Sequence, residues 1–309
     1  LLVNDVLAEL ARFQTPPGTS GTLGLRSEPV WVRIPVTVPV ASNGLWVLDI
    51  DYPVLQRIDV YLAADGHVTQ QATLGSLQPY TQRPLRSRTH ALPLTMLPGH
   101  AYDLLLRVET RGAMVLPITL NKPTTWHSKA LNEQMLQGSL TGLALCLLIY
   151  SLAQWLKLPD VLFIPSALLV TGSLLFSLHL FGLGTQYLWR DMPWVELHAA
   201  SLAALTATCG SFLFISQALA GDRPRSWLLR SVRGGAVLCV VLAALYALDL
   251  LSTRAVTGIV SILGLVPALM GIPGAVRRAR LGDPLGSTLL LAWLLYFLAA
   301  RIKARERLS

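Results

Sequence analysis

The sequence predicts an α+β membrane protein in which an antiparallel β-sandwich precedes a bundle of membrane-spanning helices. Two observations lead to this fold class. The chain of 309 residues is 53% hydrophobic and only 14% charged, whereas soluble domains carry roughly 25% charged residues. The hydrophobic residues alternate with polar ones in the first part of the chain and form long apolar runs in the second. We therefore predict two domains, residues 1–133 and residues 134–309.

Short strands account for most of the first domain. From Val30 to Val38 every second residue is apolar, and the same period recurs over residues 46–50, 58–62 and 102–108. Turn dipeptides such as Asp65-Gly66 separate these runs. Six to eight such strands predict an antiparallel sandwich. Residues 3–13, before the first strand, predict one or two turns of amphipathic helix.

The second domain contains six apolar stretches that approach the length needed to cross a bilayer. They cover residues 135–156, 161–181, 195–219, 234–251, 255–276 and 284–300. Basic residues concentrate in the loops at 219–234 and 276–284, which the positive-inside rule places in the cytoplasm. Counting back through three crossings places the sandwich outside, in the periplasm of a Gram-negative cell.

The basic end of the chain conflicts with six crossings, because an even number would place residues 301–307 outside. Either the last stretch is re-entrant, or the positive-inside rule fails here, or a seventh crossing is missing from the sequence between 284 and 300. We favour the missing crossing. The end of the chain is then a basic helix in the cytoplasm.

Charge and cysteine content exclude several classes of protein. The net charge is +8, and most of it lies in the membrane loops, so we expect no nucleic-acid partner. Cys146, Cys209 and Cys239 all lie in apolar runs without CxxC spacing, which indicates buried packing. The histidines have no paired-ligand spacing, so no metal site is expected.

One face of the predicted sandwich offers a candidate ligand site. If the even positions of the first strand face the core, Trp31 and Arg33 share the opposite face. The same alternation places Tyr61, Arg107 and Glu109 opposite their own core rows. An aromatic platform beside arginine suits sugars or carboxylates, because the ring covers apolar faces while the guanidinium holds oxygens. The alternative is a surface ion pair between Arg107 and Glu109, with Trp31 packed on a loop or on the N-terminal segment.

Five further residues are candidates with simpler alternatives. Arg83 and Arg88 lie in a basic loop that could bind an anion, touch lipid headgroups or be merely solvated, and we favour solvation. His179, Glu196 and His198 lie in predicted helices, where ionisable residues are candidates for proton or ligand roles. The alternative for Glu196 and His198 is a position at the membrane interface.

Motifs along nearly the whole chain carry a family resemblance. In the first domain they are Trp31-Val-Arg33, Trp46-Val-Leu-Asp-Ile, Ile58-Asp-Val-Tyr-Leu, Leu74-Gly75, Arg83-Pro84, Tyr102-Asp-Leu-Leu-Leu-Arg107 and Leu116-Pro-Ile-Thr-Leu. In the second domain they are Gly138 and Gly142 with Leu148-Ile-Tyr150, and Gly184-Thr-Gln-Tyr-Leu-Trp189. Together they resemble the bacterial seven-transmembrane receptors with diverse intracellular signalling modules.

The resemblance implies a jelly-roll-like sensor, seven helices and a C-terminal cytoplasmic output, commonly a diguanylate cyclase or a histidine kinase. We accordingly expect a receptor of the bacterial inner membrane that acts as a homodimer in the lipid bilayer. A small periplasmic ligand, a carbohydrate or a carboxylate, would shift the helices and signal to an output module that this chain does not include. The sequence departs from the family in showing six helices rather than seven.

Two other functions were weighed. The sequence contains no GxSxG, P-loop, HExxH, GGDEF or kinase histidine motif, so we expect neither catalysis nor a cofactor. A transporter or channel with a substrate-capturing β-domain would predict an internal repeat, and none is convincing. A membrane-anchored enzyme acting on envelope glycans would need a carboxylate pair or a metal cluster at the outer surface, and Asp49 and Asp51 on one strand face are weak support for such a pair.

Overall fold

The structure is a computed structural model that describes residues 3–14, 21–26, 28–157, 163–218, 226–283, 286–295 and 298. The chain forms two compact units. The first contains Leu1–Thr141 and Ser177–Ala200, and the second contains Gly142–Phe176 and Ser201–Ser309. The first unit thus includes two helical segments besides the strands.

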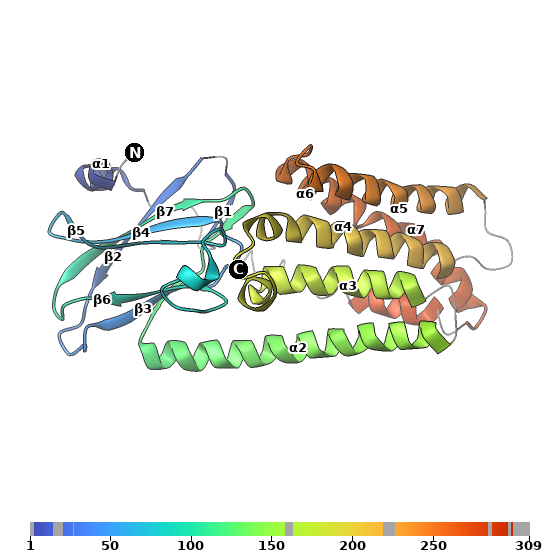
Figure 1. Ribbon diagram of the computed structural model, residues 1–309, viewed down its shortest axis with the longest axis horizontal. Helices are drawn as coiled ribbons and strands as arrows, with labels where there is room; N and C mark the ends of the chain where they lie inside the picture. The colour runs from blue at the N-terminus through green and yellow to red at the C-terminus, as the bar shows by residue number, and fades with distance from the viewer. Residues whose placement is uncertain are drawn as a thin grey trace. The chain divides into compact units, whose positions relative to one another are not determined.

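Nine strands form three antiparallel sheets in the described part of the first unit (Figure 1). They are β1 (Thr22–Leu25), β2 (Val30–Thr37), β3 (Leu45–Ile50), β4 (Arg57–Ala64), β5 (His67–Leu74), β6 (His90–Thr95), β7 (Ala101–Glu109), β8 (Ala113–Val115) and β9 (Ile118–Asn121). A four-stranded sheet has the order β2-β7-β4-β5, a three-stranded sheet has the order β6-β3-β9, and β1 pairs with β8. A short helix, α1 (Val3–Ala8), and a 3-10 turn, η1 (Leu10–Arg12), precede them.

The hydrophobic core lies between the two larger sheets, as the alternation predicts. Leu48 and Ile50 of β3 are fully buried, and they share one core with Leu104 and Leu106 of β7. The predicted turn at Asp65-Gly66 joins β4 to β5, with positive φ at both residues, 50° and 77°. Such a two-residue turn matches the twist of a hairpin. The antiparallel sandwich is confirmed.

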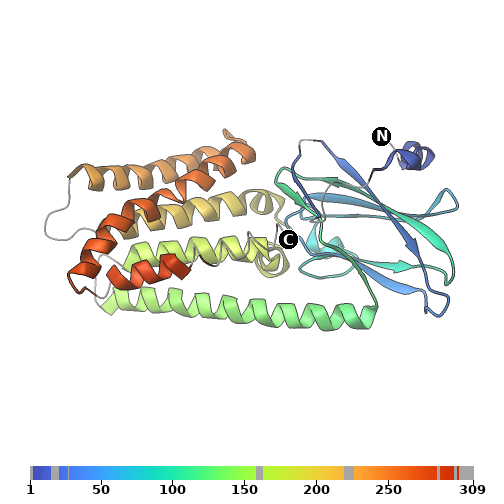
Figure 2. The same ribbon diagram turned by 180° about the vertical axis from the view of Figure 1, so that it is seen from behind.

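The remaining elements are helices, and five spans of the described chain are long and apolar enough to cross a membrane (Figure 2). The helices are α2 (Pro123–Lys157), α3 (Phe163–Leu180), α4 (Pro193–Ala218), α5 (Ser226–Ala247), α6 (Thr253–Leu263) and α7 (Val266–Arg280). Thr253–Arg280 is a single span that α6 and α7 share. The prediction of a polytopic helical domain after the sandwich is confirmed.

The structure corrects one predicted helix and describes another only in part. The stretch 255–276 was expected as one helix, but it breaks at Gly264 and Leu265 between α6 and α7. Within the stretch 284–300, residues 286–295 form an apolar helix, and the other residues except 298 lie outside the described residues. The basic end at 301–309 lies outside the described residues.

Helices of the second unit pack closely where their residues are small. A Cβ on Gly172 of α3 would lie 2.3 Å from the backbone nitrogen of Ala207 in α4. A Cβ on Gly210 of α4 would lie 2.4 Å from the backbone nitrogen of Leu169. Small residues let membrane helices approach in this way.

Candidate functional site

The predicted ligand residues gather on the outer face of the four-stranded sheet. Trp31 of β2 lies opposite Arg107 of β7, and Arg33 lies two residues further along the same strand face. Tyr61 of β4 reaches the same place, where its ring stacks on Trp31 with centroids 5.7 Å apart and planes inclined by 26°. Glu109 stands at the end of β7 on this face. Strand pairing therefore brings these five predicted residues together.

The arginines of this face form ion pairs with carboxylates of the same chain. Arg33 Nε donates to Asp103 Oδ1 at 2.7 Å. Arg107 donates through Nη1 to Asp59 Oδ2 at 3.1 Å and through Nη2 to Glu109 Oε2 at 3.2 Å. The ion pair between Arg107 and Glu109, one of the two alternatives from the sequence, is thus present. A ligand carboxylate would have to displace these partners.

A small cavity separates this face from the N-terminal segment. Its volume is about 180 Å³, and its lining residues are Val6, Glu9, Arg12, Phe13 and Trp31. The N-terminal segment is attached to the sheet by Arg33, whose Nη1 donates to the carbonyl oxygen of Leu10 at 3.3 Å. Trp31 therefore contacts both Tyr61 and the cavity, and its indole is only partly buried.

Arg83 and Arg88 lie elsewhere, in the loop between β5 and β6, and the prediction that they are solvated is wrong. Each is only 8% exposed. Arg83 Nη2 donates to the carbonyl oxygen of Gly75 at 3.4 Å, and its guanidinium lies over the ring of Tyr80. Burial lowers the pKa of Arg83 from its usual value. Arg86, between them, is the exposed arginine of this loop.

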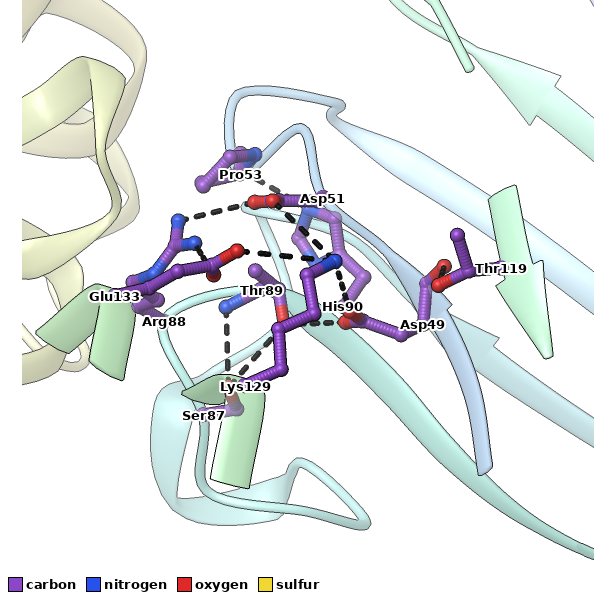
Figure 3. Close-up of polar contacts among 10 residues, drawn as sticks. All are labelled: Asp49, Asp51, Pro53, Ser87, Arg88, Thr89, His90, Thr119, Lys129 and Glu133. Atoms are coloured by element: carbon purple, nitrogen blue, oxygen red, sulfur yellow. Dashed lines mark hydrogen bonds and ion pairs between the residues drawn. The ribbon is translucent and has the colours of Figure 1, made fainter. Parts of the chain in front are cut away.

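Arg88 belongs to an ion network between the three-stranded sheet and the first turns of α2 (Figure 3). Its Nη1 lies 3.0 Å from Asp51 Oδ1, and its Nη2 donates to Glu133 of α2. Lys129, one turn earlier in α2, lies 3.8 Å from Glu133 and 3.8 Å from Asp49. We call Asp49, Asp51, Arg88, Lys129 and Glu133 the junction network.

Two buried titratable groups lie at this network. Asp49 is 3% exposed and accepts a hydrogen bond from Thr89 Oγ1 at 2.6 Å. Burial raises its pKa, which the Thr89 hydroxyl and Lys129 oppose. His90 is 1% exposed, and its Nε2 donates to the carbonyl oxygen of Pro53 at 3.0 Å when the neutral ring is protonated there. Burial lowers the pKa of His90 to about 3, so the ring is neutral at pH 7.

The three predicted intramembrane residues lie in the part of α3 and α4 that groups with the sandwich. Glu196 Oε2 accepts hydrogen bonds from Thr185 Oγ1 and Trp189 Nε1, both at 2.7 Å. His179 Nδ1 lies 3.7 Å from Glu196 Oε1. The ring of His198 stacks on Trp194 at 4.4 Å between centroids, and its Nδ1 lies 2.8 Å from the Trp194 carbonyl oxygen.

The connection between α3 and α4 is folded against the sandwich. It contains a π-helical turn, η3 (Gly184–Leu188). The backbone N–H of Tyr80 donates to the carbonyl oxygen of Arg190 at 3.1 Å. Thr81 donates through Oγ1 to Asp191 Oδ1 at 3.2 Å. We call residues 181–192 the α3–α4 connection.

Comparison with known families covers both halves of the chain. The family described as 7TMR-DISM extracellular 2 matches residues 1–122, and the family described as 7TM diverse intracellular signalling matches residues 133–305. The second match alone covers more than half of the chain. The protein belongs to the 7TM diverse intracellular signalling family. No curated protein is significantly similar to it.

Membership in the 7TM diverse intracellular signalling family makes the chain a multi-pass membrane protein with a receptor-type architecture. The two matched families describe an extracellular domain and a membrane domain of receptor type, and domains of this type are not catalytic. Within the described residues, no group of three His, Cys, Asp or Glu side chains could hold a metal ion.

In this member of the 7TM diverse intracellular signalling family, the sequence analysis did not identify the residues that connect the sandwich to α2 and to the α3–α4 connection. Lys129 and Glu133 lie four residues apart at the start of α2, a spacing that places both on one helix face. That spacing was a usable signal. The contacts of Tyr80 and Thr81 with the α3–α4 connection had no signal in the sequence, because they join residues 110 positions apart in the chain.

Proposed function

We propose that the protein is a bacterial inner-membrane sensor that binds a small periplasmic ligand at the cavity beside Trp31. The observation that carries this proposal is the cavity of about 180 Å³ between Trp31 and the N-terminal segment. It is smaller than the roughly 300–1,000 Å³ of pockets for drug-sized molecules. A ligand no larger than one sugar ring suits that volume.

The contacts on this face favour a carbohydrate over a carboxylate. A carboxylate needs a free guanidinium, but Arg33 and Arg107 are already paired with carboxylates of their own sheet, and Arg12 in the cavity lining is paired with Glu9. A sugar needs an aromatic ring for its C–H face and polar groups for its hydroxyls. Trp31 supplies the ring, and Glu9 and Arg12 supply polar groups in the cavity lining.

The orientation we propose places the sandwich in the periplasm and the basic loops in the cytoplasm. The α3–α4 connection supports this, because it groups with the sandwich and so belongs to the same side. The next connection and the end of α7 then lie on the opposite side, where Arg277, Arg278 and Arg280 are found. A cytoplasmic output module of the diguanylate cyclase or histidine kinase type, in a homodimer, would receive the signal.

Ligand titration of the full chain in lipid nanodiscs tests the sensor site. Neutral monosaccharides and small mono- and dicarboxylates are compared by saturation-transfer NMR. We expect saturable binding of a monosaccharide that Trp31→Ala weakens about tenfold or more, because the ring contact is lost. Trp155→Ala is the matched control, since Trp155 is an exposed tryptophan of α2 outside the cavity. Binding of carboxylates alone, or binding that Trp31→Ala leaves intact, contradicts this site.

A further inference from the structure

Two helical segments reach the sandwich at the same short piece of chain. The first turns of α2 pack on the outer face of the three-stranded sheet, where Trp126 is buried against Val47 and Ala91. The α3–α4 connection packs on the loop between β5 and β6. Both contacts lie within the first compact unit. Arg88 takes part in both of them, through different atoms.

The side chain of Arg88 holds α2. Its guanidinium is bonded to Asp51 after β3 and to Glu133 in α2. The side chain of Arg88 is 8% exposed, whereas those of Asp51 and Glu133 are 26% and 30% exposed. The arginine therefore lies beneath the two carboxylates and bridges the sheet to the helix. A bridge of two charge-assisted bonds fixes the position of α2 relative to the strand.

The backbone of Arg88 lies directly against the α3–α4 connection. Gly182 has φ +74°, and a Cβ placed on it would lie 2.3 Å from the carbonyl oxygen of Arg88 and 2.8 Å from Cβ of Pro53. No side chain fits in this contact without moving the backbone at Arg88. Pro53 is itself held by His90, which bonds its carbonyl oxygen. The connection is therefore seated on the residue that also bridges to α2.

We propose that Arg88 couples α2 to the α3–α4 connection, so that a shift of one segment against the sandwich shifts the other. A displacement at Gly182 moves the Arg88 backbone and alters the geometry of its bonds to Asp51 and Glu133. A displacement of α2 pulls the same residue from the other side. The coupling is reciprocal by thermodynamic necessity. Its role as the route of the ligand signal rests on the proposed function, but the coupling itself needs no ligand.

Hydrogen exchange of the full chain in lipid nanodiscs tests this coupling with one variant on each side. Gly182→Ala strains the α3–α4 connection, and Glu133→Gln weakens the α2 contact. We expect each variant to reduce protection about tenfold or more in both segments, residues 126–134 and 181–192, because local opening of one releases the other. Protection in the four-stranded sheet stays unchanged and shows that the sandwich remains folded.

Matched controls separate coupling from general loosening. Arg86→Gln removes an exposed arginine from the same loop, and Gly138→Ala adds a methyl group to α2 where no atom lies within 4 Å. Arg86→Gln is expected to change protection in neither segment, and Gly138→Ala is expected to leave residues 181–192 unchanged and to preserve or raise protection in α2, because alanine favours a helix more than glycine does. If each variant loosens only its own segment, the coupling is refuted.

A milder pair of variants keeps the test decisive if Gly182→Ala prevents folding. Asp191→Asn weakens the hydrogen bond from Thr81 without a steric clash, and its effect on residues 126–134 is then measured instead. No change in those residues overturns the proposal. Failure of the ligand titration with reciprocal loosening intact would refute the ligand site and leave the coupling standing.

Discussion

The two outer faces of the sandwich carry similar residues and differ in what covers them. On the four-stranded sheet, Arg107 bonds Asp59 and Glu109 within the sheet itself. On the three-stranded sheet, Arg88 bonds a carboxylate of α2. The first face neutralises its own charges and keeps a cavity beside an aromatic ring. The second face uses its charges to hold a helix.

This difference shows that a charged row on a strand has no function by itself. The side-chain alternation places Asp49 and Asp51 outside the core just as it places Trp31 and Arg33 outside it. Only the covering element decides whether such a row meets solvent, a ligand or a helix. The predictions below compare the two faces, beginning with the largest effect.

Loss of Arg88 is expected to be the most damaging change on either face. Arg88→Ala leaves Asp51 and Glu133 with only the more distant Lys129, at 4.0 and 3.8 Å, and we expect a loss of about 3 kcal/mol, the low end for a broken buried ion pair because both carboxylates also retain some water. Arg107→Ala should cost about 1 kcal/mol, since the buried Asp59 keeps its bonds from Arg57 and Thr73 and the pair with the exposed Glu109 contributes little. Thermal unfolding in nanodiscs compares the two variants, and equal losses would contradict the distinction.

Acid is expected to weaken the three-stranded sheet through His90. Because the pKa of His90 falls to about 3 in the folded chain, the unfolded chain takes up the proton first as the pH drops below the ordinary value near 6.5. The contribution of neutral His90 to the free energy of unfolding is fully present above pH 6.5 and is lost as the pH falls from 6.5 to 3. By pH 5 the loss should reach about 2 kcal/mol.

Hydrogen exchange in β3 and β6 at pH 7 and pH 5 measures this loss. His90→Gln keeps a donor for the Pro53 carbonyl oxygen but has no group that titrates in this range. The hydrogen-exchange protection of β3 and β6 in this variant should therefore depend less steeply on pH. Asp49, whose pKa is raised, has the opposite sign, but its contribution is common to both proteins and cancels in the difference. Identical pH profiles for the two proteins would exclude His90 as the source.

The stack of Trp31 on Tyr61 is expected to contribute least. A double-mutant cycle of Trp31→Ala and Tyr61→Ala should give a coupling free energy of about 1 kcal/mol, which is typical of an aromatic pair. A second double-mutant cycle, of Trp31→Ala with Arg88→Ala on the other face, should give a coupling free energy of zero. A coupling between the faces as large as that of the stack would show that they do not act independently.

The sequence was sufficient for the sandwich, its alternating rows and most of the membrane helices. Alternation identifies a buried row because successive side chains of a strand point to opposite faces. The length of an apolar run identifies a membrane-spanning helix, because the hydrocarbon core of a bilayer has a known thickness. The sequence did not predict the break at Gly264 and Leu265, because the apolar composition of residues 255–276 suits a single continuous helix.

Only the tertiary structure decided what each exposed row does. The sequence places Arg83, Arg86 and Arg88 in one basic loop, yet Arg86 is exposed while the other two are buried. Their different surroundings come from Tyr80, Glu133 and the α3–α4 connection. Local patterns describe which way a side chain points, whereas burial and pairing depend on segments that meet it from far along the chain. For that reason the fold could be predicted from the sequence, whereas of the junction network only the spacing of Lys129 and Glu133 gave a signal.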